Sequence, residues 1–347
     1  MKKRIIQSST ALLAATALLM AIICMTLPLK TLATNLSSIT NDNNNNNNNN
    51  NTNPSNKTAA PAPTAAVQQA SDQSRVSVVA SFFPIYEFVK AVGKDKVDLS
   101  SLIPIGSEPH NFDSTIQDIQ KADLADLLVY NGASMEEPWI HKLTPKNTLD
   151  SSKGINLLPN QNDPDIKGPN DPHIWLNPVF AKQQVQNIRD GLVKIDPKNA
   201  AYYKQNAQNF IGQLDKLDAA FRGNLSSSNC AKRDFIAFHH AFTYFANQYG
   251  LTQHSIQGLT PQGEVLPQKL VEVMNLAKNL GLKVIYSEDL IDPRSSEAIA
   301  EQIPGSKVMV LSPIEGIKAE EQKAGLGYLD KMYQDLAALK VGLQCKI

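Results

Sequence analysis

The sequence predicts an α/β protein of two lobes, each with a roughly four-stranded parallel sheet flanked by helices, joined by a long rigid spine helix. Short β-rich runs alternate with helical patterns from Arg75 onward, which is typical of parallel sheets covered by helices. A long amphipathic stretch at residues 177–225 interrupts this alternation, which then resumes. The chain has 347 residues, 42% of them hydrophobic, enough to bury the cores of two such lobes.

Residues 1–32 are predicted to be a signal peptide or an N-terminal membrane anchor. The start, MKKR, is basic, and residues 5–29 carry no charge, which is typical of a secretory signal. The uncharged stretch is also long enough to span a bilayer, and the basic start orients the rest of the chain to the outside. Lipid attachment at Cys24 is a further alternative, which the bulky Ile23 before it disfavours.

Residues 33–75 are predicted to be a disordered tether. Residues 43–51 form an unbroken asparagine run, and the stretch after them is rich in Pro, Ala, Ser, Thr and Gln. Such a segment buries too little apolar surface to offset the conformational entropy lost on ordering. Its position favours a spacer between a membrane anchor and an exported domain over a random insertion.

The N-terminal lobe is expected at residues 76–176. Its helical patterns lie between strand-like runs, and Pro84 and Gly93 mark the start and the end of the first helix. Four strands are predicted, at residues 76–81, 97–103, 126–132 and 154–158.

The linking spine is expected at residues 177–225. Asn177-Pro178 and Asp196-Pro197 each open a helical pattern. In residues 197–222 apolar side chains recur at helical spacing along one stripe; they are Tyr203, Phe210, Leu214, Leu217 and Phe221. A helix of that length runs about 40 Å, which is longer than one small lobe.

The C-terminal lobe is expected at residues 226–347. Strands are predicted at residues 234–238, 252–256, 283–287 and 307–311, and helices at residues 240–249, 267–280 and 320–341. Cys230 and Cys345 are the cysteines of the folded part. Export favours a disulfide between them, and two unpaired buried thiols are the alternative.

The formal net charge of +0 predicts no electrostatic attraction of the protein to nucleic acid.

Three histidines and a glutamate are the candidate functional residues. His239 and Glu288 directly follow predicted strands, while His110 and His173 lie in loops of the N-terminal lobe. Because ligands bind beyond the carboxyl ends of parallel strands, these side chains are expected to meet in the cleft between the lobes. Three imidazoles and one carboxylate form a tetrahedral site suited to zinc, although each histidine taken alone is more often solvated or structural.

The chain from about residue 76 to its end resembles the zinc/manganese solute-binding proteins of ABC transporters. The matching stretches include GSEPHNFDSTIQDIQKADLADLLVYNG, DPHIWLNP, HHAFTYFANQYGL and PQGEVLPQKLVEV. The resemblance implies two α/β lobes, a rigid long helix and a metal bound between the lobes. It implies that His110, His173 and His239 are the ligands and that His240 is a variable neighbour.

The fourth ligand departs from the family pattern. Many members carry an aspartate in a D-P-L stretch, where this chain reads VLSPIEG with Ser312 at that position. Glu288, Glu315, Glu108 and water are the alternatives, and Glu288 is preferred because it directly follows a strand. The resemblance places Glu264, in TPQGEVLP, behind the ligands rather than on the metal.

The resemblance implies capture of a divalent cation outside the cytoplasm and its delivery to a membrane ABC permease. Zinc is preferred to manganese because manganese sites lean toward oxygen ligands, although the His-rich loop of many zinc members is absent from residues 151–170. The protein is expected to be a monomeric carrier that is tethered to the membrane through its N-terminus, and it is not expected to be an enzyme. The alternatives are a manganese- or iron-binding member, a secreted zinc hydrolase with Glu288 as general base, and a surface adhesin with an incidental metal.

Overall fold

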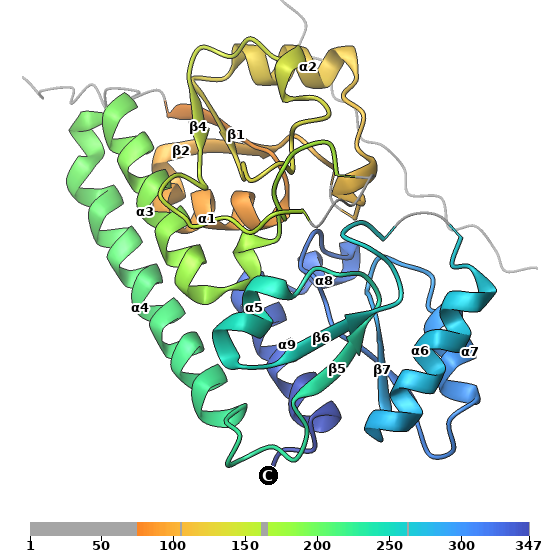
Figure 1. Ribbon diagram of the computed structural model, residues 1–347. Coiled ribbons are helices and arrows are strands. Elements are labelled where there is room, and N and C mark those ends of the chain that lie inside the picture. Colours follow the sequence, from red (N-terminus) through yellow and green to blue (C-terminus); the bar gives the residue numbers. More distant parts are fainter. Residues whose placement is uncertain (1–74, 105, 161–165, 262–263, 347) are drawn as a thin grey trace, which may run out of the picture. The chain divides into compact units, whose positions relative to one another are not determined.

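The computed structural model describes residues 75–104, 106–160, 166–261 and 264–346. The predicted signal or anchor and nearly all of the predicted tether lie outside these residues. Among the described residues, two four-stranded parallel sheets are flanked by helices, which confirms the predicted α/β fold (Figure 1). No helix in these ranges is both long and apolar enough to cross a membrane.

The N-terminal sheet has the strand order β2-β1-β3-β4, and all of its pairs are parallel. The central strand β1 is mostly apolar, and its last three residues are buried. The helix that follows it, α1 (Phe83–Gly93), has a proline in its first turn. Helix α2 (Ile116–Leu124) starts with a capping box formed by Thr115 and Asp118. The strands are β1 (Val76–Ala80), β2 (Val97–Ser101), β3 (Leu127–Tyr130) and β4 (Thr148–Asp150).

The predicted strand at residues 154–158 is wrong, because the fourth strand of this sheet is β4, at Thr148–Asp150. The apolar side chains of residues 155–158 pack instead against a small cluster that contains Ile174 and Tyr244. The backbone N–H of Leu158 donates to the Tyr244 hydroxyl at 2.9 Å. Packing against this cluster therefore explains the apolar side chains among residues 155–158, and these residues do not pair with a strand of the sheet.

Two long helices follow the N-terminal sheet. Helix α3 (Pro178–Ile195) begins at Asn177, whose side chain accepts from the N–H of Val179. Helix α4 (Ala200–Asn224) has 25 residues and covers all but the first three residues of the long helix predicted at residues 197–222. Figure 1 shows α3 and α4 side by side, in agreement with their extensive contact.

Helix α4 contacts elements of both halves of the described chain. The amide of Asn206 donates to the carbonyl of Val92 in α1 at 3.0 Å. Asp218, farther along α4, accepts from the hydroxyl of Tyr249 at 2.9 Å. Four of the five residues of the predicted stripe are fully buried, with Phe210 only partly so. The helix therefore touches both lobes, and its rigidity as a spine stays a prediction.

The C-terminal sheet has the strand order β6-β5-β7-β8 and repeats the topology of the first sheet. Its strands are β5 (Asp234–Ala237), β6 (Thr252–Ser255), β7 (Val284–Ser287) and β8 (Lys307–Val310). Its helices are α5 (Thr243–Tyr249), α6 (Pro267–Leu280), α7 (Arg294–Glu301), α8 (Ala319–Lys323) and α9 (Tyr328–Gly342). The predicted helix at residues 320–341 is thus two helices, separated at Gly325, whose φ of 81° ends the first one.

Cys230 and Cys345 form a disulfide across 115 residues, which decides between the two alternatives drawn from the sequence. The bond joins the segment before β5 to the residues after α9. The buried core is continuous from β1 through α3 and α4 to α9, because one hydrophobic cluster includes side chains of all four elements. This core positions the loops that carry the candidate site.

Candidate metal centre

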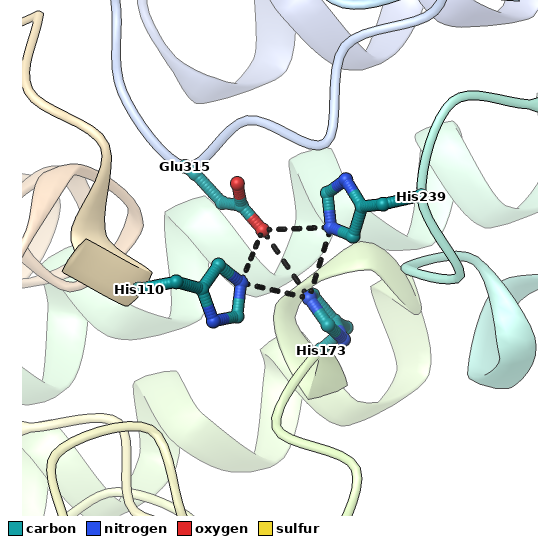
Figure 2. Close-up of side chains that lie close together, drawn as sticks. All are labelled: His110, His173, His239 and Glu315. Carbon is teal, nitrogen blue, oxygen red and sulfur yellow. Dashed lines mark hydrogen bonds and ion pairs between the residues drawn. The ribbon is translucent and has the colours of Figure 1, made fainter. Parts of the chain in front are cut away.

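Three imidazoles and one carboxylate meet at a single point in the structure (Figure 2). Each residue directs one donor atom inward, and these atoms all lie within 4.8 Å of one another. The donors are Nε2 of His110, His173 and His239 and Oε1 of Glu315.

Five of the six distances between the donor atoms are close to those of a tetrahedron, and the sixth, from Nε2 of His110 to Nε2 of His239, is within 4.8 Å. The Nε2 atom of His173 lies 3.3 Å from the Nε2 atoms of His110 and His239. The Oε1 atom of Glu315 lies 3.1 Å from Nε2 of His110 and 3.2 Å from the other two. Ligands placed tetrahedrally at about 2.0–2.1 Å from a zinc ion are separated by about 3.3–3.4 Å. The donor set therefore fits zinc in both its chemistry and its spacing.

Loops beyond strand ends present the three histidines. His110 lies in the short turn Pro109–Asn111, where the Glu108 side chain accepts from the His110 N–H at 3.0 Å. The backbone before His173 is held by Asn131, which follows β3 and donates to the carbonyl of Pro172 at 2.9 Å. These contacts fix the two loops of the N-terminal lobe that face the site.

His239 follows β5 in the C-terminal lobe, and strand β6 holds its backbone. The side-chain N–H of Gln253 donates to the His239 carbonyl at 2.7 Å. The same side chain accepts from the N–H of Phe242 at 2.7 Å, so it bridges the loop between β5 and α5. The neighbouring His240 turns toward Ser255, with its Nδ1 3.3 Å from the hydroxyl.

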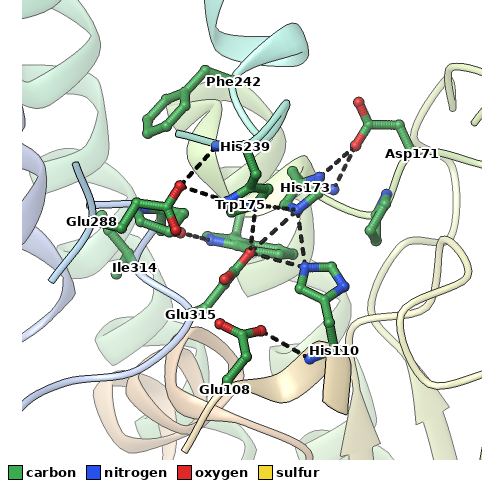
Figure 3. Close-up of polar contacts among 12 residues, drawn as sticks. Glu108, His110, Asp171, His173, Trp175, His239, Phe242, Glu288, Ile314 and Glu315 are labelled. Carbon is green, nitrogen blue, oxygen red and sulfur yellow. Dashed lines mark hydrogen bonds and ion pairs between the residues drawn. The ribbon is translucent and has the colours of Figure 1, made fainter. Parts of the chain in front are cut away.

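Buried carboxylates stand behind two of the imidazoles (Figure 3). Asp171 Oδ1 lies 2.8 Å from Nδ1 of His173, and Glu288 Oε1 lies 2.6 Å from Nδ1 of His239. Because a carboxylate accepts, each Nδ1 carries a proton, which leaves Nε2 as the nitrogen that can bind a cation. A cation at the centre would be bound by these Nε2 atoms in place of any proton they carry.

Glu288 lies next to the site, but on the far side of His239 from the centre. Its Oε1 also accepts from the backbone N–H of His239 at 3.0 Å. The carboxylate that reaches the three Nε2 atoms belongs to Glu315, in the segment between β8 and α8. Glu264, placed behind the ligands by the family resemblance, is exposed before the start of α6.

The site is closed to solvent. The side chains of His173 and His239 are fully buried, and those of His110 and Glu315 are only 4% and 1% exposed. By contrast His141 is exposed, and His254 is paired with Asp234 on the sheet, with Nε2 and Oδ1 2.9 Å apart. Neither belongs to the cluster.

Burial and mutual contact shift the pKa values of the clustered groups. Burial alone favours the neutral acid, but contact with His239 and His110 holds the pKa of Glu315 well below its usual range. Burial lowers the pKa of the His239 imidazole, yet the charges of Glu288 and Glu315 outweigh it and raise that pKa well above its usual range. Burial prevails at His110, whose pKa is lowered. The centre thus keeps an ionised carboxylate among imidazoles of unequal basicity.

Glu108 differs from the other carboxylates near the centre. Burial, followed by the charge of Glu315, raises the pKa of Glu108 to about 9. The side chain is therefore a neutral acid near pH 7, and it serves the backbone of His110 rather than the centre. A neutral acid adds no charge to the donor set.

Known proteins are similar to the chain in both sequence and fold. The family model of the zinc-uptake complex component A, periplasmic, matches residues 78–342. The chain is 38% identical over 291 residues to the high-affinity zinc uptake system protein ZnuA of Bacillus subtilis, covering 80% of this chain and 90% of that one. It is 35% identical over 298 residues to the zinc-binding protein AdcA of Streptococcus pyogenes, covering 79% of this chain and 57% of that longer protein.

A solved structure agrees with these relatives. The Zn(II)-bound ZnuA-like domain of Streptococcus pneumoniae AdcA superposes with a TM-score of 0.68 at 33% identity, covering 78% of this chain and 99% of that one. The predicted resemblance to metal-binding solute-binding proteins is confirmed. The chain belongs to the ZnuA family, the periplasmic zinc-binding component A of zinc-uptake complexes.

Proposed function

We propose that the protein captures Zn²⁺ with His110, His173, His239 and Glu315 and delivers it to an ABC permease in the membrane. One observation carries the proposal: four buried donor atoms from distant parts of the chain converge within 4.8 Å of one another. The names of the relatives, which describe zinc uptake and zinc binding, support zinc as the cargo.

In this proposal Glu315 is the fourth ligand in place of Glu288. The Oε1 atom of Glu315 lies within 3.1–3.2 Å of all three Nε2 atoms. Glu288 and Asp171 have another task, which is to hold the proton on Nδ1 of His239 and His173.

The donor set favours zinc over manganese. Three imidazole nitrogens and one carboxylate oxygen suit a borderline-soft ion, whereas Mn²⁺ sites are richer in oxygen and have higher coordination numbers. The four donors are shielded from solvent, which disfavours the additional water ligands of an octahedral ion. Selection is therefore proposed to rest on both donor type and burial.

Burial of the four donors also supports a carrier over a zinc hydrolase. A catalytic zinc keeps one coordination position open for water or substrate, whereas a carrier site is filled by protein ligands. The general base of the hydrolase alternative, Glu288, is engaged by Nδ1 and the backbone N–H of His239. We therefore propose that the protein has no hydrolytic activity.

Delivery is proposed to use the division of the ligands between the lobes. His110 and His173 belong to the N-terminal lobe, and His239 and Glu315 to the C-terminal lobe. A small relative shift of the lobes on the permease would separate the two pairs and release the ion. Export, tethering through the N-terminus and action as a monomer are further parts of the proposal, consistent with the periplasmic family.

The test is zinc affinity, measured by competition with a chelator of known affinity. Replacing any ligand, as in His173→Ala or Glu315→Ala, is expected to weaken binding by more than the roughly 10–100-fold typical of residues behind the ligands. The control is His141→Ala, which removes an exposed histidine. Unchanged affinity in the ligand variants would refute the site, and normal zinc uptake by cells that lack the protein would refute the transport role.

A further inference from the structure

Trp175 connects the two halves of the candidate centre. It lies two residues after His173 and is fully buried. Its indole Nε1–H donates to the carbonyl of Pro313 at 2.8 Å, a partner 138 residues away in sequence. Pro313 lies two residues before Glu315. The hydrogen bond therefore joins the segment of one ligand to the segment of another, and Figure 3 shows Trp175 between them.

Contacts hold both the indole ring and the backbone carbonyl of Trp175 in place. Its ring lies 5.0 Å from that of Phe82 in an edge-on contact, and 5.2 Å from the imidazole of His173. The hydroxyl of Tyr328, in α9, donates to the Trp175 carbonyl at 2.6 Å. The indole N–H is thus aimed at Pro313 by contacts from both lobes.

The segment that carries Glu315, residues 311–317, also forms hydrogen bonds with Asp335 of α9 and with Asp289. The backbone N–H of Ser312 donates to Asp335 at 2.8 Å, and its hydroxyl donates to Asp289 at 3.0 Å. Asp289 is in turn paired with the buried Lys331 at 2.7 Å. This polar network anchors the start of the segment.

The residue between Pro313 and Glu315 has a costly backbone conformation. Ile314 has a φ of 56°, in the left-handed region that a β-branched side chain rarely adopts, and its side chain is fully buried. Such a conformation persists only where its surroundings impose it. The hydrogen bond from Trp175 on one side and the Ser312 network on the other are those surroundings, and the turn they impose points Glu315 at the histidines.

We propose that Trp175 is a positioning residue that holds the Glu315 carboxylate at tetrahedral spacing and so sets the preference for zinc over manganese. The inference rests on the proposed function, in which Glu315 is a ligand. Without the indole donor, the turn at Ile314 relaxes and Glu315 moves away from the imidazoles. The centre then admits water ligands, which favour the higher coordination numbers of Mn²⁺.

A double-mutant cycle with Trp175→Phe and Glu315→Ala tests the proposal. The Phe ring keeps an aromatic side chain against Phe82 and His173 but removes the donor. Alone, Trp175→Phe is expected to weaken zinc binding by about three- to tenfold, the effect of one hydrogen bond, and to leave Mn²⁺ binding unchanged. In the Glu315→Ala background, the same substitution is expected to have no further effect on zinc binding.

Cobalt supplies a readout that a merely structural role would not move. Tetrahedral Co²⁺ absorbs visible light far more strongly than six-coordinate Co²⁺, so the absorption of the Co²⁺-loaded protein is expected to fall in Trp175→Phe. The control is Trp139→Phe, because Trp139 is also buried and packs against Phe112 in the N-terminal lobe. The Trp139 variant is expected to keep both the wild-type zinc-to-manganese ratio and the wild-type spectrum.

Each outcome has a distinct meaning. An equal loss of zinc affinity from Trp175→Phe with and without Glu315, or an unchanged zinc-to-manganese ratio, would overturn the positioning role. Wild-type affinity in Glu315→Ala alone would instead overturn the ligand assignment of the proposed function. If Trp175→Phe does not fold, Tyr328→Phe, which removes the donor to the Trp175 carbonyl, takes its place in the cycle with the same expectations.

Discussion

The direction in which an imidazole presents its lone pair is decided on the opposite side of the ring. Asp171 and Glu288 accept from Nδ1 of His173 and His239, so that Nε2 of each ring faces the centre. Both carboxylates are buried, which strengthens their hydrogen bonds and fixes the tautomers. In the proposed function the two acids are thus as much a part of zinc binding as the ligands they support.

Asp171→Asn and Glu288→Gln are expected to weaken zinc binding by about 10–100-fold, the usual effect of removing a carboxylate behind a metal-bound histidine. The amide keeps the size of the side chain but lowers the basicity of the imidazole. The matched control is Asp234→Asn in β5, which alters a histidine–carboxylate pair with His254 of β6, away from the cluster. Zinc titration of the three variants checks this, and equal affinities would show that the carboxylates do not tune the ligands.

Zinc binding is expected to weaken as the pH falls from about 8 to about 5, because zinc binds the neutral imidazole and must displace any proton from it. The charges of Glu288 and Glu315 outweigh the effect of burial and raise the pKa of His239, so competition begins above the usual histidine range. The lowered pKa of His110 delays its own competition to lower pH. The apparent Kd should rise by about tenfold per pH unit for each proton displaced.

Affinity measured in matched buffers across that range checks the pH dependence. The ionised state of Glu315 does not limit binding, since its pKa is well below the usual value. A Kd that stays constant from about pH 7 to about pH 5 would contradict ligation by histidine.

At the scale of single residues, the sequence predicts the histidines better than the carboxylate. His239 directly follows a predicted strand, and His110 and His173 lie in predicted loops of the other lobe, so the rule for parallel sheets points to all three. The same rule favours Glu288, which the structure places beside His239. Glu315 is brought to the centre by the left-handed turn at Ile314, and no pattern in a single sequence marks an isoleucine for that conformation.

At the scale of the elements, helix α9 packs closely against strand β7 of the C-terminal sheet. Tyr286, in β7, donates to the carbonyl of Ala338 at 2.8 Å. This contact is possible because Gly342 lacks a side chain: a Cβ at that position would lie 2.2 Å from the Tyr286 hydroxyl. The glycine therefore serves the packing of helix on strand rather than an unusual backbone angle.

Gly342→Ala is expected to destabilise the protein by about 1–3 kcal/mol, because the buried tyrosine must shift in a packed core. The matched control is Gly212→Ala in α4, where a Cβ meets no atom within 4 Å. That substitution is expected to stabilise the protein by about 0.5–1 kcal/mol through helix propensity. Denaturant unfolding of both variants checks the pair, and a Gly342 variant as stable as the wild type would contradict the packing described.

Element boundaries follow from the sequence where a strand or helix has a strong pattern of its own. The long helix is predicted from the stripe that begins at Tyr203, and α4 buries that stripe. Strand β4 has only three residues with a single leucine, so its signal is weak, while the more apolar residues 154–158 give a stronger one. Their actual partner, Tyr244, lies 86 residues beyond Leu158, and a local pattern contains no information about it.

At the scale of the whole molecule, the disulfide encloses the entire C-terminal lobe. It closes 115 residues of chain, from before β5 to after α9. The double variant Cys230→Ser with Cys345→Ser is expected to lose about 2–4 kcal/mol of stability, largely because the unfolded chain gains freedom. Thermal unfolding with and without reductant checks this loss.

Zinc affinity is the second measurement on the disulfide variant. Helix α9 extends about 22 Å from Tyr328, near Trp175, to the end that the disulfide anchors. The zinc Kd of the double variant is therefore expected to stay within about twofold of the wild type. A parallel loss of affinity would mean that the disulfide shapes the centre as well as stabilising the lobe.

The central claim is that His110, His173, His239 and Glu315, from both halves of the chain, share one zinc ion. Anomalous diffraction at the zinc absorption edge, from crystals of zinc-loaded protein, tests it most directly. The expected result is a single strong peak about 2.0–2.1 Å from the three Nε2 atoms and one carboxylate oxygen of Glu315. A peak elsewhere on the molecule, or a zinc ion held by one half of the chain alone, would contradict the account.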